Sequence, residues 1–286
     1  MNHSKQVKQY YEQNTRRFIH LKKDVTKSIH QPLWKEDSYS TEEAYNYSNQ
    51  LILKEIQQHK TNQSLTIIDL GCGVGSSIFY LQQQFPASYY GITISPTQIA
   101  LAKQKAKQSA LQNTIQFLEA DFTNLPKLLP KVDIAFSIEA FIHAADANKY
   151  FEQVSQHLKT GGKLILIDDF LTNEIDINQL DKKSKQAIQD FQYGWLANSL
   201  TSQTALSSIA NSHSLQLLES TNLTPYMRNN TWKHKWIRLL VTTFRWLYNL
   251  APKKSYYFRS WIGGQAKQYC FKKGLIQYRK VVFEKV

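Results

Sequence analysis

Four residues at every second position form the pattern in this chain that is best suited to chemistry: Asp69, Gly71, Gly73 and Gly75. A β-branched run precedes them, and a helical pattern begins at Ser76. A strand, a glycine-rich turn and a helix start let a nucleotide-like ligand lie against bare backbone, because glycine has no side chain to hold it away. A structural turn that binds no ligand is the alternative.

The spacing of these glycines separates three nucleotide chemistries. A P-loop needs Lys and Ser or Thr after its glycines, whereas Gly75 is followed by Ser76-Ser77. A dinucleotide site wants G-x-G-x-x-G/A, which this spacing fits poorly. The pattern Asp-x-Gly-x-Gly-x-Gly instead resembles the first motif of the class I S-adenosylmethionine (SAM) dependent methyltransferases. The resemblance implies that the glycines let the backbone approach the methionine moiety, and that Asp69 meets the ammonium group of SAM directly or through water.

A second motif follows the predicted strand 89–94, where the chain reads Gly-Ile-Thr-Ile-Ser-Pro-Thr-Gln over 91–98. Many class I enzymes carry an acid at the place of Thr93, which holds the ribose hydroxyls. The variant found here resembles that of tocopherol, dimethylglycine and prenyl diphosphate methyltransferases. The resemblance implies that Thr93 and Gln98 hydrogen bond to the ribose end of SAM. Thr93 is otherwise a plain β-branched strand residue.

A third motif, Glu119-Ala-Asp-Phe122, follows the predicted strand 115–119. In the family that this chain resembles, the acid bonds the adenine amino group and its neighbour packs against the ring. The resemblance gives these roles to Asp121 and Phe122. A turn cap formed by Asp121 is the alternative.

The fourth predicted strand, 132–138, leads into Glu139-Ala-Phe-Ile-His143. This segment closely resembles the one after the fourth strand of sterol C-methyltransferases, where a Glu and a His stand four apart. Polar groups that leave the carboxyl end of a central strand point into the ligand crevice of a doubly wound sheet. If the segment turns helically, Glu139 and His143 share a face, so that one orients the other and the pair removes a proton. Alternatively, Glu139 braces SAM or a neighbouring loop.

The fifth predicted strand, 163–169, ends in Asp168-Asp169. Paired carboxylates at a strand end raise each other's pKa and can serve as a base or stabilise a cation. We therefore place Asp169 at the substrate, although solvated loop acids explain the pair equally well.

Aromatic residues complete the set of site candidates. The start Tyr10-Tyr11-Glu12, followed later by Trp34, resembles the helical lid of the same small-molecule methyltransferases. In those enzymes the tyrosine of the Tyr-acid pair, here Tyr11, closes over the cofactor. We expect Tyr11, Trp34 and Trp195 to border the substrate, although aromatic residues are more often core.

Methyl transfer from a sulfonium is an in-line displacement, so the site must align the reacting atoms and exclude water. It requires no metal, and the sequence shows no tight His, Cys and Asp cluster at ligand spacing. A hydroxyl acceptor needs a base such as His143. An alkene acceptor leaves a carbocation, which aromatic faces stabilise and which Glu139 or His143 quenches.

The elements that must position these residues alternate between strand and helix from 65 to 169, which predicts an α/β fold with a doubly wound parallel sheet. Seven strands are expected, at 65–70, 89–94, 115–119, 132–138, 163–169, 215–220 and 275–284. Helices are expected at 76–85, 96–108 and 147–158, the last ended by Gly161-Gly162. The resemblance makes this sheet a Rossmann-like methyltransferase sheet. We divide the chain into a helical lid (1–60), a SAM-binding core (61–225, with an insertion at about 171–212), a basic aromatic helical insertion (226–273) and a last core strand (274–286).

The positive charge of the chain is unevenly placed. Of the 35 Lys and Arg residues, 14 lie between Tyr226 and Val286 beside a single acid, so the remainder is neutral. Four of the six tryptophans lie there too, and Trp232, Trp236, Leu239, Leu240, Thr243 and Leu247 recur at helical spacing. A solvated basic face explains this, and so does contact with a diphosphate, an acidic carrier or an anionic membrane through 226–273.

Cysteine content and hydropathy indicate the compartment. The two cysteines, Cys72 and Cys270, exclude a disulfide framework. The N-terminus lacks the apolar region of a signal peptide, and no apolar run reaches the roughly 20 residues of a membrane span. We therefore expect a cytoplasmic protein, with peripheral membrane contact as an option.

These observations favour a SAM-dependent methyltransferase acting on a lipophilic or anionic small molecule, such as an isoprenoid methylated at carbon. O- or N-methylation of a natural product, free or carrier-bound, remains an alternative. RNA methylation fits less well, because the fourth-strand motif lacks an Asn/Asp-Pro-Pro-Tyr type sequence and the basic residues are confined to one segment. A SAM-binding scaffold without activity is a further alternative, and the oligomeric state is not predicted.

Overall fold

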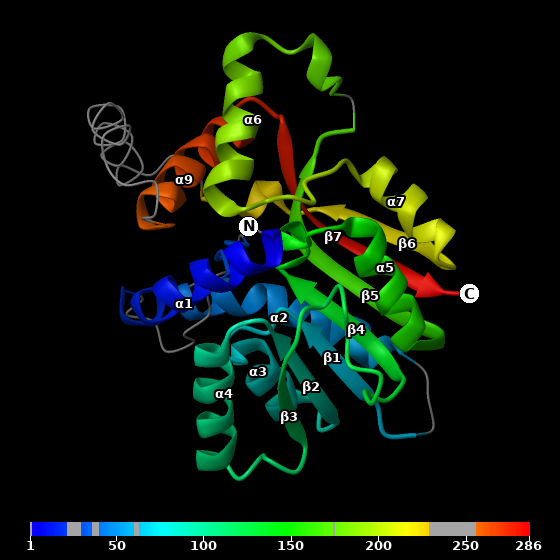
Figure 1. The fold of residues 1–286 in the computed structure, drawn as a ribbon. Helices are drawn as coiled ribbons and strands as arrows, with labels where there is room; N and C mark the ends of the chain where they lie inside the picture. The colour runs from blue at the N-terminus through cyan, green and yellow to red at the C-terminus, as the bar shows by residue number, and fades with distance from the viewer. Residues whose placement is uncertain (1, 22–29, 36–39, 60–62, 174, 229–255) are drawn as a thin grey trace.

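A computed structural model describes residues 2–21, 30–35, 40–59, 63–173, 175–228 and 256–286 of the chain (Figure 1). The sheet has seven strands in the order β3-β2-β1-β4-β5-β7-β6. Strands β1 to β5 are parallel, whereas β7 pairs antiparallel with both β5 and β6. The strands are β1 Thr66–Leu70, β2 Ser88–Thr93, β3 Ile115–Glu119, β4 Val132–Ile138, β5 Leu158–Leu171, β6 Leu215–Asn222 and β7 Ile276–Lys285.

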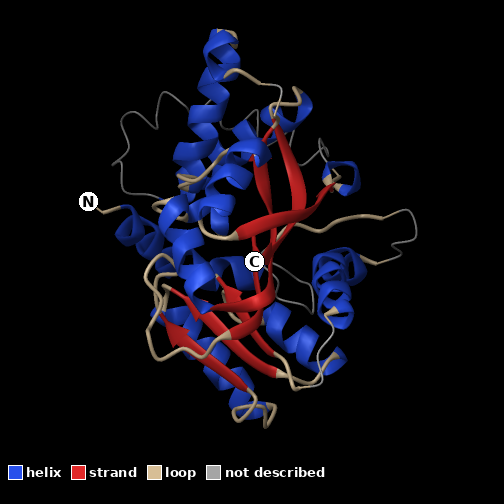
Figure 2. Ribbon diagram, turned by 90° about the vertical axis from the view of Figure 1, so that its right-hand side faces the viewer, coloured by secondary structure: helices blue, strands red, loops and turns tan. Residues whose placement is uncertain are grey.

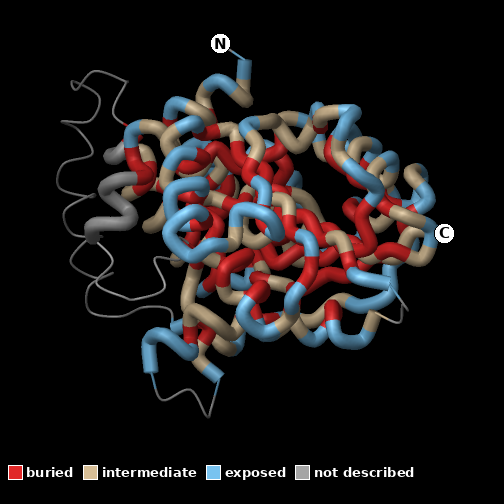
Figure 3. Tube along the Cα trace, turned by 90° about the horizontal axis from the view of Figure 1, so that it is seen from below, coloured by how far each residue is buried: buried red, intermediate tan, exposed pale blue. Residues whose placement is uncertain are grey.

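Helices cover both faces of this sheet (Figure 2). Buried residues of α2, α3, α4, α6 and α9 share one apolar core, while those of α5 and α7 belong to another. Buried residues gather in the interior of the molecule, and exposed residues lie mainly at its periphery (Figure 3). The helices are α1 His3–Leu21, α2 Thr41–Gln58, α3 Ser76–Gln84, α4 Pro96–Gln108, α5 Ala147–His157, α6 Lys182–Trp195, α7 Gln203–Ser212 and α9 Tyr256–Lys272, with 3-10 turns η1 Phe141–His143, η2 Ile177–Gln179 and η3 Thr224–Tyr226.

The predicted α/β fold with a doubly wound sheet is confirmed. Six of the seven strands begin and end within two residues of their expected bounds, because each combines a β-branched apolar run with a clear turn signal. The antiparallel direction of β7 is a feature that the pattern did not indicate. The aromatic stripe at 232–247 lies outside the described residues.

The expected bounds of the fifth strand, 163–169, were wrong, and so was the helix end assigned to the two glycines before it. Instead of ending a helix, Gly161-Gly162 lies inside β5, which begins at Leu158. Gly161 has a φ of +76°, and a Cβ on Gly162 would lie 2.8 Å from the Lys159 carbonyl oxygen. The pairing of β4 with β5 shifts register here. The two glycines therefore form an irregularity in the strand, which a sequence pattern cannot distinguish from a helix end.

Helix α1 lies over the carboxyl ends of two neighbouring parallel strands, β3 and β2. Lys8 pairs with Glu119 at the end of β3, at 2.6 Å. Glu12 accepts hydrogen bonds from Ser95 and Thr97, which follow β2. Because these contacts surround the strand ends where the candidate residues lie, α1 is a cover for that edge of the sheet.

Among the residues that the structure describes, no helix has the length and apolarity needed to cross a membrane.

Candidate functional site

The glycine turn is built so that larger residues cannot replace its glycines. Gly71, Gly73 and Gly75 have φ angles of +102°, +54° and +79°. A Cβ on Gly71 would lie 2.3 Å from Ala140 Cβ, and one on Gly75 would lie 2.6 Å from Phe117 Cζ. Gly75 also begins α3 without a side-chain cap, so the N–H groups of the first turn remain for a ligand.

Asp69 lies at the end of β1 with its side chain almost fully buried, at 4% exposure. Burial raises the pKa of this carboxyl well above its usual value, and no hydrogen bond from the described residues counteracts it. A buried carboxylate is unfavourable unless a cation or a donor pairs with it. The ammonium group of a bound amino acid moiety supplies both, which agrees with the role expected of Asp69.

Thr93 and Gln98 lie together at the end of β2, as expected. Thr93 Oγ1 donates a hydrogen bond to Gln98 Oε1 at 2.6 Å, and Gln98 Nε2 donates to Thr15 Oγ1 at 3.1 Å. Both side chains are buried. The pair thus connects α1 to the strand end, and its contact with a ribose stays a prediction.

Asp121 forms the turn cap that was its alternative role. Its Oδ1 accepts hydrogen bonds from the Thr123 backbone N–H at 2.9 Å and from the Thr123 hydroxyl at 2.7 Å. These bonds use one oxygen only, so they are compatible with an adenine contact through the other. Phe122 lies close to Gly71, 3.8 Å from where its Cβ would be, and packs edge-on against Tyr150. The Phe122 ring therefore lies beside the glycine turn, and its contact with an adenine ring stays a prediction.

Glu139 follows β4 in a strained backbone conformation, with a φ of +50°. A non-glycine residue in this region costs about 1–3 kcal/mol and occurs often at functional sites. The carboxylate Oε1 accepts hydrogen bonds from the Gln31 backbone N–H at 2.8 Å and the Tyr278 hydroxyl at 3.0 Å. The strain is therefore accompanied by a fixed carboxylate orientation.

The expectation that Glu139 and His143 share a helical face is wrong. Because Glu139 has a positive φ, no helix can begin at this residue. Only the short 3-10 turn η1 follows, from Phe141 to His143. The hydrogen bonds that fix the two side chains go to different partners. Neither residue orients the other directly.

His143 is held in one tautomer by its two partners. Nδ1 lies 3.4 Å from the Leu196 carbonyl oxygen and Nε2 lies 3.0 Å from the Tyr11 hydroxyl. A carbonyl can only accept, so we assign the proton to Nδ1, and Nε2 accepts from Tyr11. Burial lowers the pKa of His143 to about 4. The imidazole is therefore neutral at physiological pH.

Asp168 and Asp169 are buried, so the alternative that they are solvated loop acids is wrong. Asp168 accepts hydrogen bonds from the backbone N–H groups of Ile142 and Asp169, at 3.0 and 2.9 Å, and so fixes η1. Burial, followed by the charge of Asp169, raises its pKa. Asp169 Oδ2 pairs with Lys267 Nζ at 2.6 Å, yet burial outweighs this pairing and raises the pKa of Asp169 to about 6.

The three aromatic candidates do not form one wall. Trp195 packs with Tyr10 at 6.4 Å between ring centroids, and Tyr11 is the neighbour of Tyr10 at 5.2 Å. Trp34 is fixed elsewhere: its backbone N–H donates to the Tyr226 carbonyl at 2.6 Å, and the Arg228 guanidinium lies 3.6 Å from its ring centroid. The structure therefore joins Tyr11 and Trp195 through Tyr10 and places Trp34 against the segment after β6.

Among the residues that contact the candidates and were not anticipated, three come from the last third of the chain. Tyr278 of β7 binds Glu139, Lys267 of α9 pairs with Asp169, and Leu196 provides the carbonyl for His143. Each is more than 50 residues away from its partner along the chain. No local pattern marks such residues, since only the sheet order and the packing of α9 bring them to the site.

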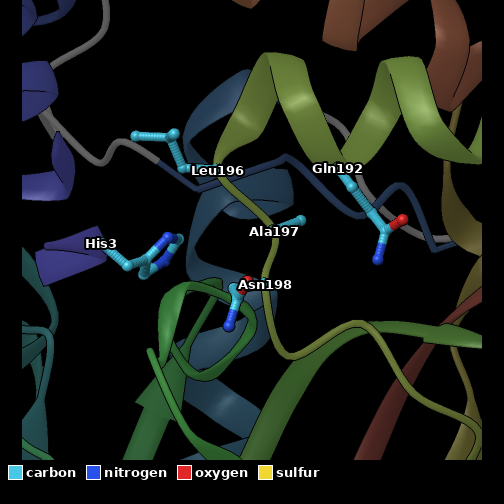
Figure 4. Close-up of a pocket in the computed structure, with 5 residues that line it drawn as sticks. All are labelled: His3, Gln192, Leu196, Ala197 and Asn198. Carbon is cyan, nitrogen blue, oxygen red and sulfur yellow. The ribbon is translucent and has the colours of Figure 1, made fainter. Parts of the chain in front are cut away.

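A pocket of about 230 Å³ lies between the start of α1 and the segment that ends α6 (Figure 4). His3 of α1 borders it on one side, and Gln192 and the segment Leu196–Asn198 border it on the other. The His3 ring lies 3.1 Å from the His143 carbonyl oxygen. The cavity thus adjoins the outer side of the loop that holds the imidazole.

Comparison with known proteins agrees with this geometry. The sequence pattern of a family described as "Methyltransferase domain" matches residues 61–239. Sterol 4-C-methyltransferase of Caenorhabditis elegans is 24% identical over 162 residues, which is 57% of this chain and 48% of that protein. Tocopherol O-methyltransferase of Arabidopsis thaliana is 33% identical over 101 residues, or 35% of this chain and 29% of that protein. The chain therefore spans half or less of the length of these two curated relatives.

Among solved structures, geranyl diphosphate C-methyltransferase of Streptomyces coelicolor A3(2) has the same fold. The TM-score is 0.69 at 15% identity, over 100% of this chain and 98% of that one. The predicted Rossmann-like methyltransferase sheet is thereby confirmed. Because the family match also extends over more than half of the residues, this chain belongs to the methyltransferase domain family.

Proposed function

We propose that the protein is a SAM-dependent methyltransferase that acts on a lipophilic small molecule. The observation that carries the proposal is the glycine turn beside Asp69, a buried carboxylate without a donor among the described residues. When bound, SAM supplies an electrophilic methyl group. Asp69, the glycine turn and the wall of Phe122 would hold it, and Thr93 and Gln98 would border its ribose.

Helix α1 is suited to exclude water from the site. Three of its side chains contact the strand ends: Lys8 binds Glu119 at the end of β3, while Tyr11 and Glu12 bind residues that follow β4 and β2. Closure of this kind removes the water that would otherwise compete for the reacting groups. We propose that residues 1–60 are a lid on this basis.

Glu139 is the better candidate base for carbon methylation. Tyr278 and Gln31 orient its carboxylate, whereas the Nε2 atom of His143 is already occupied by Tyr11 and has a pKa of about 4. After methylation of an alkene, Glu139 would take the proton that restores the double bond. Sterol and geranyl diphosphate C-methyltransferases among the similar proteins support this acceptor class.

Oxygen methylation is the second candidate, and the contact between Tyr11 and His143 favours it. A substrate hydroxyl that replaced Tyr11 at Nε2 would find a neutral imidazole ready to accept its proton. The similarity to a tocopherol O-methyltransferase supports this alternative. The position of the transferred methyl group in the product distinguishes the two.

The decisive experiment has two parts. Calorimetry should show binding of SAM and of its demethylated product, and Gly73→Asp should abolish it because the new side chain fills the turn. Labelled methyl transfer from SAM into a crude lipid extract, followed by mass spectrometry, should then identify a labelled lipophilic product. If neither cofactor form releases or absorbs heat, the proposal is wrong.

We further propose a cytoplasmic location with peripheral membrane contact through 226–273, much of which lies outside the described residues. The support is the charge of this segment. Flotation with liposomes should recover the protein only when anionic lipid is present. A salt-sensitive gel shift with tRNA would instead favour an RNA substrate.

A further inference from the structure

Lys267 of α9 brings a buried ammonium group close to the acidic residues of the proposed site. Lys267 and Asp169 are almost fully buried, at 7% and 4% exposure, and Lys267 Nζ lies 2.6 Å from Asp169 Oδ2. Burying two charges costs free energy, and apolar residues of similar size in their place are often as stable or more stable. Stability alone therefore does not explain why this pair lies here.

The pairing of β5 with β7 connects this ion pair to Glu139 through Tyr278. Asp169 of β5 is directly opposite Tyr278 of β7. Residues that are opposite each other in an antiparallel pair have their side chains on the same face of the sheet. Lys267 Nζ lies 5.8 Å from the centroid of the Tyr278 ring, and the Tyr278 hydroxyl donates to Glu139 Oε1 at 3.0 Å. The ammonium group and the Glu139 carboxylate therefore share one buried neighbour, the Tyr278 side chain.

The hydrogen bonds of Glu139 leave one of its oxygens for a proton. The Tyr278 hydroxyl and the Gln31 backbone N–H both donate to Oε1, and no hydrogen bond from the described residues reaches Oε2. After methylation of an alkene, the C–H bond beside the cation breaks, its electron pair restores the double bond, and the proton goes to Oε2. Glu139 must be ionised when that proton arrives.

Charges on α9 and β5 act on Glu139 in opposite directions. Burial opposes the charge of Lys267, but attraction to Asp169 and to Glu139 outweighs this and raises the pKa of Lys267. Coulombic coupling is mutual, so the ammonium group favours the ionised form of Glu139. Asp168 and Asp169, where they are ionised, disfavour it. The neutral groups on other elements that are coupled to Glu139 are Tyr278 of β7, His143 of η1 and Tyr11 of α1.

We propose that Lys267 is a positioning residue for Glu139: its ammonium group, held by Asp169 beside the Tyr278 ring, keeps the Glu139 carboxylate ionised so that Oε2 accepts the proton. This inference rests on the proposed methyltransferase function with Glu139 as the base. Asp169 fixes the ammonium group and also offsets part of its charge. Removal of the cation and removal of its anionic partner must therefore shift the ionisation of Glu139 in opposite directions.

NMR titration of isotope-labelled glutamate carboxyl groups tests this coupling in the full chain without a substrate. The signal of Glu139 is the one that disappears in Glu139→Gln. Lys267→Met should raise the midpoint of its titration by about half a pH unit or more, and Asp169→Asn should lower it by a similar amount. The double variant replaces the ion pair by neutral side chains of similar size, so its midpoint should lie between those of the single variants.

Single-turnover rates show whether the same charge acts in the reaction. The enzyme is used in excess over labelled SAM, with the crude lipid extract as the acceptor, and the rate of product formation is followed against pH. The acidic limb of this profile should shift in each variant in the direction of the NMR midpoint, while the SAM dissociation constant stays within twofold. Lys272→Met is the matched control, since Lys272 is an exposed cation in the last turn of the same helix, and it should leave both curves in place.

An unshifted midpoint in Lys267→Met contradicts the inference, and so do shifts of both single variants in the same direction. NMR shifts that the rate profile does not follow would overturn it as well. Thermal melting checks that each variant is folded, and Asp169→Asn carries the test if Lys267→Met does not fold. Failure of the proposed function looks different, because the wild type then binds no SAM or yields no labelled product, or Glu139→Gln turns over normally.

Discussion

Asp69, His143 and Asp169 are buried ionisable residues, and burial shifts the pKa of each of them. Glu139 is instead fixed in orientation by hydrogen bonds from Gln31 and Tyr278. His143 is neutral because burial lowers its pKa to about 4, and its two hydrogen bonds choose the tautomer. Burial raises the pKa of Asp169 to about 6 in spite of the adjacent Lys267 ammonium. The sequence identified these side chains as candidates, but not their partners, which come from distant segments.

The pKa of His143 predicts a specific effect of acid on stability. Unfolded His143 binds a proton near its usual pKa of 6.5, whereas the folded imidazole does so near 4. Between these values the unfolded state binds more protons, so the free energy of unfolding falls as the pH falls, by about 3 kcal/mol in total. Asp169 acts in the opposite direction, because its folded pKa is raised.

The contribution of His143 must therefore be measured as a difference. Denaturant titrations of wild type and His143→Gln between pH 7 and 4 should show the stability advantage of wild type shrinking as the pH falls. A difference that stays constant across this range would mean that His143 is not held neutral in the folded state.

Glu139→Gln tests the carboxylate as the proton acceptor. The amide keeps the shape of the side chain but cannot take a proton, so turnover should fall by at least about 100-fold. The SAM dissociation constant should not change, because Asp69 and the glycine turn are untouched. Glu152→Gln, an exposed change on α5, is the control in steady-state assays with labelled SAM. Normal turnover in Glu139→Gln would exclude it as the base.

At the level of elements, the sequence predicts the bounds of those strands and helices whose ends are marked by local patterns. Strands β3 and β4 and helix α4 have the expected bounds, because apolar runs, Ser95 as a cap and Pro96 at the first turn mark their ends. The conformation of Glu139 and the course of β5 through Gly161 follow from contacts between strands. For the same reason each proposed cofactor residue could be predicted from one local motif, whereas Tyr278 and Lys267 could not.

Glu55 of α2 joins two strands through buried ion pairs, and its removal should destabilise the fold. Its carboxylate lies 2.9 Å from Lys163 of β5 and 2.8 Å from Lys280 of β7. Burial opposes its ionisation, but the hydrogen bonds from Lys280 and Lys163 outweigh this and lower its pKa. Glu55→Gln removes the anion that pairs with Lys163 and leaves Lys280 with Glu219 alone, at 2.9 Å. Breaking a buried ion pair by removing one partner costs about 3–5 kcal/mol.

Thermal and denaturant unfolding should show this loss, while the affinity for SAM stays unchanged because the triad is remote from the glycine turn. Glu42→Gln is the matched control, since Glu42 is exposed in the first turn of the same helix. Equal stability of the two variants would show that the triad is not needed to dock α2.

At the scale of the whole molecule, hydrogen bonds join helix α1, which covers the proposed site, to α4 and α9. Ligand binding and closure of α1 should therefore be coupled. Glu12 holds α1 to the start of α4, where it accepts hydrogen bonds from the Thr97 N–H at 3.2 Å and the Thr97 hydroxyl at 2.7 Å. Tyr256 of α9 adds a hydrogen bond to Gln9 at 3.1 Å. If closure over SAM strengthens these contacts, then removing one of them must lower the affinity for the cofactor.

Hydrogen exchange with and without the demethylated cofactor measures this coupling. A ligand at 100 times its dissociation constant stabilises the folded state by about 2.7 kcal/mol, and amides of α1 should share in that protection. Glu12→Gln replaces the carboxylate by an amide, which should lower cofactor affinity a few-fold and reduce the protection of α1 more than that of β1. If the cofactor slows exchange equally in α1 and in the remote helix α7, or if Glu12→Gln leaves the affinity unchanged, then α1 covers the sheet edge without responding to the cofactor.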